Sequence, residues 1–112
     1  SILMGAPNVV RGGSHSGNIA AVDLAREGFL DILSSGYVPS SLLMGALQLS
    51  ERVASISLAD AVRTVTRAPA QAVGFTDRGE IARGKRADLI RVHVGAGVPA
   101  VRAVWRAGVR VA

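Results

Sequence analysis

The sequence of 112 residues contains no cysteine, which excludes disulfide bonds and metal sites built from thiolates. Its aromatic residues are two Phe, one Tyr and one Trp, so it has few rings on which nucleic-acid bases could stack. Although 49% of the residues are apolar, no apolar run is long enough to span a membrane, and no signal peptide is visible. These absences exclude a disulfide-rich scaffold and predict a cytoplasmic protein with no membrane partner.

Lysine is nearly absent as well, because Lys85 is the only one, and arginine carries almost all of the positive charge. The net charge is +5 and the isoelectric point is about 11.3. Two interpretations remain open, namely attraction to a polyanion or phosphorylated small molecule, and a solvated basic surface. The arginines are spread from Arg11 to Arg110 without clustering, so we expect no nucleic-acid partner.

The most unusual stretch is "MGAPNVVRGGSHSGN", residues 4–18, which follows a short apolar segment. Glycines let backbone N–H groups approach an anion, arginine adds a charged fork, and the start of a helix adds partial positive charge. The side chains that could contact phosphate oxygens here are Asn8, Arg11, Ser14, His15 and Asn18. The spacing matches neither the P-loop nor the dinucleotide fingerprint, so a surface turn with incidental polar residues remains the alternative.

Apolar periodicity and glycine or proline stops divide residues 1–74 into alternating strands and helices. We expect buried strands over residues 2–4 and 29–33, and helices over residues 18–28, 42–53 and 57–74. Ser40 or Ser41 would cap the second helix and Ser57 the third, which Pro69 must interrupt or kink.

Residues 75–112 have a different character, because "DRGEIARGKRADLIRVHV" and "VRAVWRAGVRVA" alternate and carry glycines at turn spacing. This pattern predicts short antiparallel strands, with Trp105 packed in the β unit and His93 in a strand without a function. The chain is therefore predicted to be α/β, with residues 1–74 as two βα units plus helices and residues 75–112 as a small β domain. Two βα repeats followed by strands suggest the tail of an α/β barrel.

A second polar loop, "SSGYVPSS", residues 34–41, follows the second predicted strand. Because ligands bind at the carboxyl ends of parallel strands, both loops are placed where a site would form, and Tyr37 joins the candidate residues. No second histidine or carboxylate lies at ligand spacing near His15, so we interpret His15 as a substrate contact rather than a metal ligand.

Four blocks of the sequence, "MGAPNVVRGGSHSGN", "LDILSSGYVPSSLL", "DRGEIARGKRADLIRV" and "VRAVWRAG", resemble the M-protein family of phosphonate metabolism. This family of the carbon–phosphorus lyase pathway is itself similar to metal-dependent amidohydrolases. The resemblance covers essentially the whole chain, and its third block is shared by the β domains of many amidohydrolases. It implies the C-terminal part of a distorted (β/α) barrel, followed by a β unit from a composite β-sandwich.

The resemblance also implies an activity, which is removal of diphosphate from α-D-ribose 1-methylphosphonate 5-triphosphate by water activated on a divalent metal. It makes the phosphorylated ribose phosphonate the expected ligand of six residues. These substrate-binding candidates are Asn8, Arg11, Ser14, His15, Asn18 and Tyr37.

Two departures from the family pattern limit what this chain could do alone. The chain begins at Ser1 and lacks the early barrel strands with their metal ligands, so we expect a fragment of a longer protein that binds no metal itself. Gly36 stands where the family has an aspartate that binds metal, so no catalytic residue is assigned. Glycine can also adopt backbone angles forbidden to aspartate, which would give the loop a different shape.

The expected function is therefore that of an inactive fragment of a phosphonate-pathway hydrolase, and two other hypotheses stay open. One is a binding module that associates with itself as a homo-oligomer through exposed strand edges and apolar faces. The other is a fragment of an amidohydrolase that acts on a cyclic amide or a nucleobase.

Overall fold

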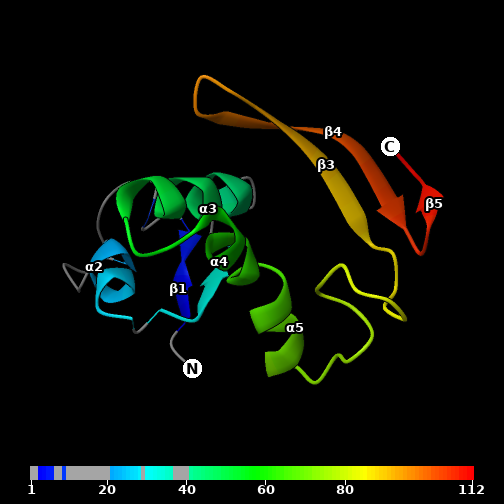
Figure 1. Ribbon diagram of the computed structural model, residues 1–112, viewed down its shortest axis with the longest axis horizontal. Coiled ribbons are helices and arrows are strands. Elements are labelled where there is room, and N and C mark those ends of the chain that lie inside the picture. Colours follow the sequence, from blue (N-terminus) through cyan, green and yellow to red (C-terminus); the bar gives the residue numbers. More distant parts are fainter. Residues whose placement is uncertain (1–2, 7–8, 10–20, 29, 37–40) are drawn as a thin grey trace. The chain divides into compact units, whose positions relative to one another are not determined.

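The computed structural model of the chain describes residues 3–6, 9, 21–28, 30–36 and 41–112. The chain divides into two compact units, Ser1–Val65 and Thr66–Ala112, whose elements are shown in Figure 1. None of the helices in the described ranges combines the length and apolarity that a membrane crossing requires.

The first unit contains two parallel strands, β1 (Leu3–Gly5) and β2 (Ile32–Ser34), with Met4 opposite Leu33. Between them in sequence lies α2 (Ala21–Arg26), so this unit is a β-α-β arrangement and the α/β prediction is confirmed. The strands were expected to be buried, which is correct for Leu33 but wrong for Leu3, whose surface is 57% exposed. The expected beginning of the helix at residue 18 lies outside the described residues.

The core of this unit forms where α3 (Ser41–Arg52) packs against the strands and the following helix. Its buried residues are Val9, Ala25, Leu33, Leu49, Val53 and Ala61. A Cβ atom on Gly45 would lie 2.9 Å from the Ala6 Cβ atom, so α3 approaches the chain after β1 very closely. The apolar face of α3 therefore holds the segment that leaves β1.

The third expected helix is two helices, α4 (Leu58–Arg63) and α5 (Arg67–Ala72), and the expected break at Pro69 is wrong by several residues. Ser57 caps α4 as predicted, because its Oγ atom accepts a hydrogen bond of 3.1 Å from the Asp60 backbone N–H. A proline ring collides with the carbonyl four residues earlier, which here belongs to Val65. A helix that contains Pro69 must therefore start after Val65, and the break falls there.

The break also lets the end of α4 contact the sheet. The Thr64 carbonyl accepts a hydrogen bond of 3.1 Å from the Leu33 N–H of β2. The Thr64 hydroxyl donates to the Ala61 carbonyl at 2.6 Å, within the last turn of α4. The chain after α4 is therefore tied to the middle of β2.

The second unit contains an antiparallel sheet of β3 (Leu89–Gly95), β4 (Val98–Arg106) and β5 (Val109–Arg110) in that order. Antiparallel strands were predicted here, but the part of the prediction that covered residues 77–88 is wrong. This segment is a loop, in which the Arg86 N–H donates to the Asp77 carbonyl at 2.6 Å. Those groups are consequently not paired with a neighbouring strand.

Both strand connections are tight two-residue turns. Ala96 precedes Gly97 with a φ of 51°, and Ala107 precedes Gly108 with a φ of 48°. Positive φ at both turn positions defines the type I′ hairpin, whose twist matches that of the flanking strands. The predicted glycine turn near the end of the chain is therefore confirmed.

Candidate functional site

The candidate site was expected on two loops, and the side chains expected to form it fall outside the part of the chain that the structure describes. This holds for all six predicted substrate contacts, namely Asn8, Arg11, Ser14, His15, Asn18 and Tyr37. The structure describes the elements that flank these residues, and also Gly36. The structure therefore defines the strands and helices from which the two loops extend.

The two loops leave the sheet at the same edge. Gly5 and Ser34 end the parallel strands β1 and β2 and lie opposite each other in the register. The buried Ser41 at the start of α3 donates from its Oγ atom to the Ser35 carbonyl at 3.3 Å, so the ends of the second loop are tied together. This agrees with the expectation that polar residues follow the carboxyl ends of both strands.

Gly36 directly follows this edge and has a φ of 59°. This is the left-handed helical region, which aspartate and asparagine enter more readily than other residues with a side chain. Glycine adopts this φ without strain and aspartate adopts it at some cost, so a reshaping of the loop by Gly36 stays a prediction. What the glycine changes is chemistry, because position 36 has no carboxylate oxygen to bind a metal or accept a proton.

A divalent metal does not fit the residues that the structure describes. Within these ranges there is no group of three His, Cys, Asp or Glu side chains close enough to hold an ion. Asp31, next to β2, is exposed and carries the carboxylate closest in sequence to Gly36. A metal centre would need ligands from beyond the described residues.

Arg52, the last residue of α3, contacts both Val9, within the first polar stretch, and α2, which follows that stretch, and these contacts were not anticipated from the sequence. Its Nη1 atom donates to the Val9 carbonyl at 2.6 Å, and its own carbonyl accepts from Arg26 Nη2 of α2 at 3.4 Å. The only signal in the sequence is a cation at the C-terminal end of a helix, which is common because it offsets the helix dipole.

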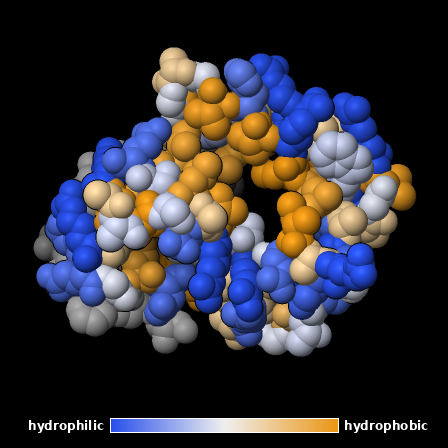
Figure 2. All heavy atoms as spheres, in the orientation of Figure 1, coloured by the Kyte–Doolittle hydropathy of each residue, from blue (hydrophilic) through white to orange (hydrophobic). Residues whose placement is uncertain are grey.

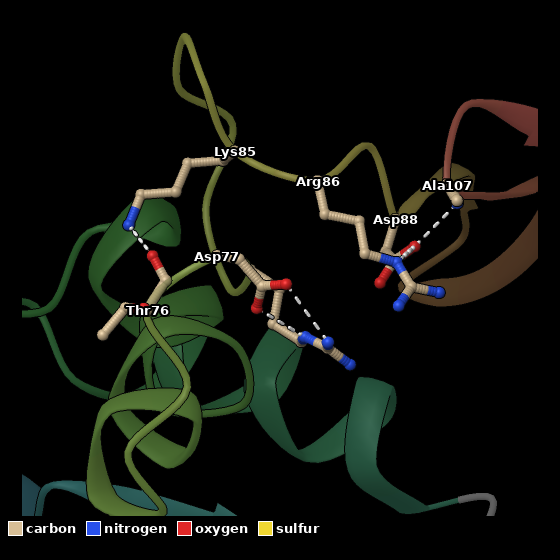
Figure 3. Close-up of polar contacts among 7 residues, drawn as sticks. Thr76, Asp77, Lys85, Arg86, Asp88 and Ala107 are labelled. Atoms are coloured by element: carbon tan, nitrogen blue, oxygen red, sulfur yellow. Dashed lines mark hydrogen bonds and ion pairs between the residues drawn. The ribbon is translucent and has the colours of Figure 1, made fainter.

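The loop before β3 contains a second polar cluster, shown in Figure 3. Asp88 Oδ1 accepts hydrogen bonds from the Ala107 N–H at 2.8 Å and from Arg86 Nε at 2.9 Å. The Ala107 N–H, and secondarily Arg86, lower the pKa of Asp88. This carboxylate thus fastens the start of β3 to the turn between β4 and β5.

The other charges of this loop also pair with one another. Arg78 Nε lies 2.9 Å from Asp77 Oδ1 and lowers the pKa of that carboxyl group, while its guanidinium lies 4.7 Å from the Phe75 ring centre. Lys85 binds the Thr76 carbonyl and lies 3.5 Å from Glu80. Because these groups hold the loop itself, we interpret "DRGEIARGKRADL" as a structural segment rather than a ligand site.

Comparison with known proteins gives two relatives and a family. The model of the amidohydrolase family matches residues 30–112. The chain is 52% identical, over 99% of its length, to alpha-D-ribose 1-methylphosphonate 5-triphosphate diphosphatase of Escherichia coli, and spans 30% of that protein. It is 33% identical over 87 residues, 70% of its length, to imidazolonepropionase of Deinococcus deserti, and spans 22% of that protein. No solved structure matches the chain.

Proposed function

The chain belongs to the amidohydrolase family, whose members generally depend on a metal, and on this premise we propose that it is a segment of a diphosphatase. The proposed reaction removes diphosphate from α-D-ribose 1-methylphosphonate 5-triphosphate. The observation that carries this proposal is the 52% identity to the Escherichia coli protein of that name, which extends over 99% of the chain. The proposed compartment is the cytoplasm.

In this proposal the β1–α2–β2 unit is the tail of a (β/α) barrel, and residues 75–112 belong to a β domain. Two parallel strands cannot close a barrel, so the remaining strands would come from other parts of a longer protein. The order β-α-β and the parallel register support this arrangement, because neighbouring barrel strands are parallel and joined by a helix.

The proposed site lies where the two loops leave the sheet. Arg11 would bind phosphate oxygens through its guanidinium, while Asn8, Ser14, His15 and Asn18 would donate further hydrogen bonds. Tyr37 would approach the ligand from the second loop, since both loops start at the edge marked by Gly5 and Ser34. In the reaction, water adds to phosphorus while the bond to the bridging oxygen breaks, and diphosphate leaves with that oxygen.

This chain by itself is proposed to be inactive and to bind no divalent metal. Gly36 contributes no side-chain ligand, and the metal of the complete enzyme would take its ligands from outside the described ranges. The test is phosphorus NMR of the triphosphate incubated with the purified chain and a divalent metal. Release of diphosphate at a rate comparable to that of the Escherichia coli enzyme would contradict the proposed inactivity.

A chimera tests the parent activity. The matching segment of the Escherichia coli diphosphatase, 30% of that protein, would be replaced by this chain with either Gly36 or Gly36→Asp. We expect the Gly36→Asp chimera to release diphosphate and the Gly36 chimera to be inactive. A folded Gly36→Asp chimera without activity would contradict the assignment.

The cyclic-amide alternative remains a second candidate because of the imidazolonepropionase relative. Its 33% identity covers 87 residues, whereas the diphosphatase match is stronger and covers nearly the whole chain, so we favour the phosphorylated substrate. Assaying the same chimeras for hydrolysis of a dihydropyrimidine ring decides between them. Hydrolysis of the ring with no release of diphosphate would reverse the choice.

The structure supports one further candidate, which is weak self-association through the sheet of the second unit. Residues that face each other across β3 and β4 share one face of a sheet. On this face Ile90 lies opposite Val104, Val92 opposite Val101, and Val94 opposite Pro99. Ile90, Val94 and Val101 are each about half exposed, and Figure 2 shows apolar residues gathered along these strands. We call this the apolar sheet face.

A second copy of the chain is the proposed occupant of the apolar sheet face. Two strands of about 7 residues at ~3.3 Å per residue, side by side at ~4.8 Å, give a face of roughly 220 Å² per copy. Two such faces bury less than the ~1,200 Å² of the smallest stable interfaces, so we expect a weak dimer. Each copy carries a net charge of +5, so two copies repel each other. Added salt screens this repulsion and should therefore strengthen the association.

Sedimentation analysis at several protein and salt concentrations tests this candidate. We expect Val101→Lys to abolish association, whereas Val73→Lys adds the same charge at an exposed position after α5 and should leave it unchanged. A monomer at every concentration, or equal effects of both variants, would exclude the apolar sheet face as a dimer interface.

A further inference from the structure

Positive and negative charges are divided unequally between the two units of the chain. With histidine counted as neutral, Thr66–Ala112 contains nine Arg or Lys and three Asp or Glu residues, a net charge of +6, whereas Ser1–Val65 has a net charge of −1. The sheet of the second unit is more one-sided still, because residues 89–112 contain four arginines and no acidic residue. The arginines are spread along the sequence, but the fold gathers four of them on one small sheet.

The carboxylates of the second unit do not neutralise these arginines. Each carboxylate forms an ion pair with a cation of α5 or of the loop before β3. These pairs are Arg67–Glu80, Arg78–Asp77, Lys85–Glu80 and Arg86–Asp88. Within the described ranges, the arginines of the sheet therefore have no acidic partner, and all of them are exposed. They are Arg91, Arg102, Arg106 and Arg110.

The strand register divides these arginines between the two faces of the sheet. Arg91 of β3 lies opposite Ala103 of β4, and Arg110 of β5 lies opposite Trp105 of β4. Because side chains alternate along a strand, residues 103 and 105 share a face, and so do the residues opposite them. Arg106 follows Trp105 directly and is therefore on the other face, which is the apolar sheet face. We call the face that carries Arg91, Trp105 and Arg110 the arginine sheet face.

The two arginines of this face lie on either side of Trp105. Neighbouring strands are ~4.8 Å apart and each residue adds ~3.3 Å along a strand, so two strands and two residues separate the Cα atoms of Arg91 and Arg110 by about 12 Å. In an extended peptide, side chains four positions apart lie on one side at a separation of ~13 Å. One extended acidic segment can therefore place a carboxylate at each guanidinium, with Trp105 between them.

The residue types of the arginine sheet face are those of a protein interface. Trp and Arg are enriched at binding hot spots, and a guanidinium can bind a carboxylate through two parallel hydrogen bonds. Single-stranded nucleic acid stacks successive bases on several rings, but Trp105 is the only Trp, Tyr or Phe in residues 89–112 and is half-buried. A carboxylate-rich protein segment therefore matches this face better than a polynucleotide does.

We infer that the arginine sheet face binds an acidic segment of a partner protein. This binding is separate from the proposed hydrolysis, because it uses none of the six residues proposed to contact the substrate. It is also separate from the proposed self-association, because the apolar sheet face lies on the other side of the same strands. The contacts are ion pairs at an exposed surface, so the binding is weak and decreases as salt is added.

The test is a titration of the chain with a synthetic peptide that carries glutamate at every second position and no tryptophan. Binding is followed by the fluorescence of Trp105, the only tryptophan of the chain, and the same peptide with glutamine in place of glutamate is the control ligand. Arg91→Gln and Arg110→Gln each remove one guanidinium from the arginine sheet face. Arg106→Gln is the matched control, because it removes the same charge from the other face.

We expect Arg91→Gln and Arg110→Gln each to weaken binding of the glutamate peptide by about two- to fivefold, the range that exposed ion pairs contribute. Arg106→Gln should leave it nearly unchanged at ~0.15 M salt, where the screening length is ~8 Å. Arg110 Nε also donates to the Ala112 carbonyl at 3.1 Å, so thermal unfolding of Arg110→Gln accompanies the titration. Arg91→Gln leaves that hydrogen bond intact and tests the face even if Arg110→Gln loosens the end of the sheet.

Three results would overturn the inference. The first is no saturable binding of the glutamate peptide, or equal binding of the glutamine peptide. The second is an equal loss of affinity in all three variants, because the net charge of the chain and not the arginine sheet face would then be responsible. The third is tighter binding of an oligothymidylate with the same number of charges, which would make nucleic acid and not an acidic protein segment the ligand of this face.

Discussion

Replacement of Gly79 by alanine should destabilise the second unit more than any other glycine-to-alanine change in its loop. Gly79 lies in the loop before β3, where a Cβ atom would be 2.8 Å from the Ala70 Cβ atom and 3.2 Å from the Arg67 Cα atom of α5. Distances below 3.0 Å between such atoms require the backbone to move. The Arg67–Glu80 ion pair, 3.5 Å long, holds the loop against this helix beside the glycine.

Two costs add at this position. The φ of Gly79 is +100°, a conformation that costs an alanine about 1–2 kcal/mol. Overpacking against a fixed backbone costs typically about 1–3 kcal/mol more. Gly84→Ala separates the two, because Gly84 has a φ of +83° but a Cβ atom added there would meet nothing within 4 Å. We therefore expect a loss of about 2–5 kcal/mol for Gly79→Ala and about 1–2 kcal/mol for Gly84→Ala.

Urea unfolding followed by the fluorescence of Trp105 measures both losses, since Trp105 is the only tryptophan and lies in β4 of this unit. The midpoint and slope give the free energy of unfolding for each variant. Equal losses for Gly79→Ala and Gly84→Ala would refute the argument, because the close approach of the loop to α5 would then contribute nothing.

Three further predictions concern the caps and turns. Ser57→Ala should reduce the stability of the first unit by about 0.5–2 kcal/mol in urea unfolding, because it removes the side-chain cap of α4, and a loss below this range would contradict the cap. Ala96→Asn should stabilise the second unit by a few tenths to about 1 kcal/mol, since asparagine tolerates a φ of 51° better than alanine, and a lower thermal midpoint would contradict it. The lowered pKa of Asp88 means that its contribution to folding stability is complete above the ordinary aspartate pKa and is lost as the pH falls through the lower folded value. The stability of Asp88→Asn in acid should therefore depend less on pH than that of the unaltered chain. An unchanged pH profile would exclude this role.

Much of the fold could be predicted from local pattern. The β-α-β order, the Ser57 cap and the glycine turns follow from apolar periodicity and residue preferences, and the structure has each of them. The position of the break between α4 and α5 was missed because the effect of Pro69 was expected at the proline itself. Its ring acts on the carbonyl of Val65, four residues earlier, and the helix had to end there.

Two other failures share a physical cause, which is hydrogen bonding between groups that are distant in sequence. Alternation in residues 77–88 predicted strands, but Asp77 and Arg86 bond to each other across the loop. The contact of Arg52 with Val9 spans 43 residues, and no local pattern indicates it. For the candidate site, the six residues proposed from local pattern lie outside the described residues and stay a prediction, and the structure adds that the flanking strands β1 and β2 end at one edge.

The hydrogen bond from Leu33 to the Thr64 carbonyl has a consequence for assembly. Because the Leu33 N–H is directed to Thr64, the middle of β2 does not present an open donor to an incoming strand. A strand in a closed barrel pairs on both sides, so completing a barrel next to β2 would require Thr64 to give up this donor. In the described unit, the Thr64 carbonyl takes the place at Leu33 that a carbonyl of a neighbouring strand would occupy.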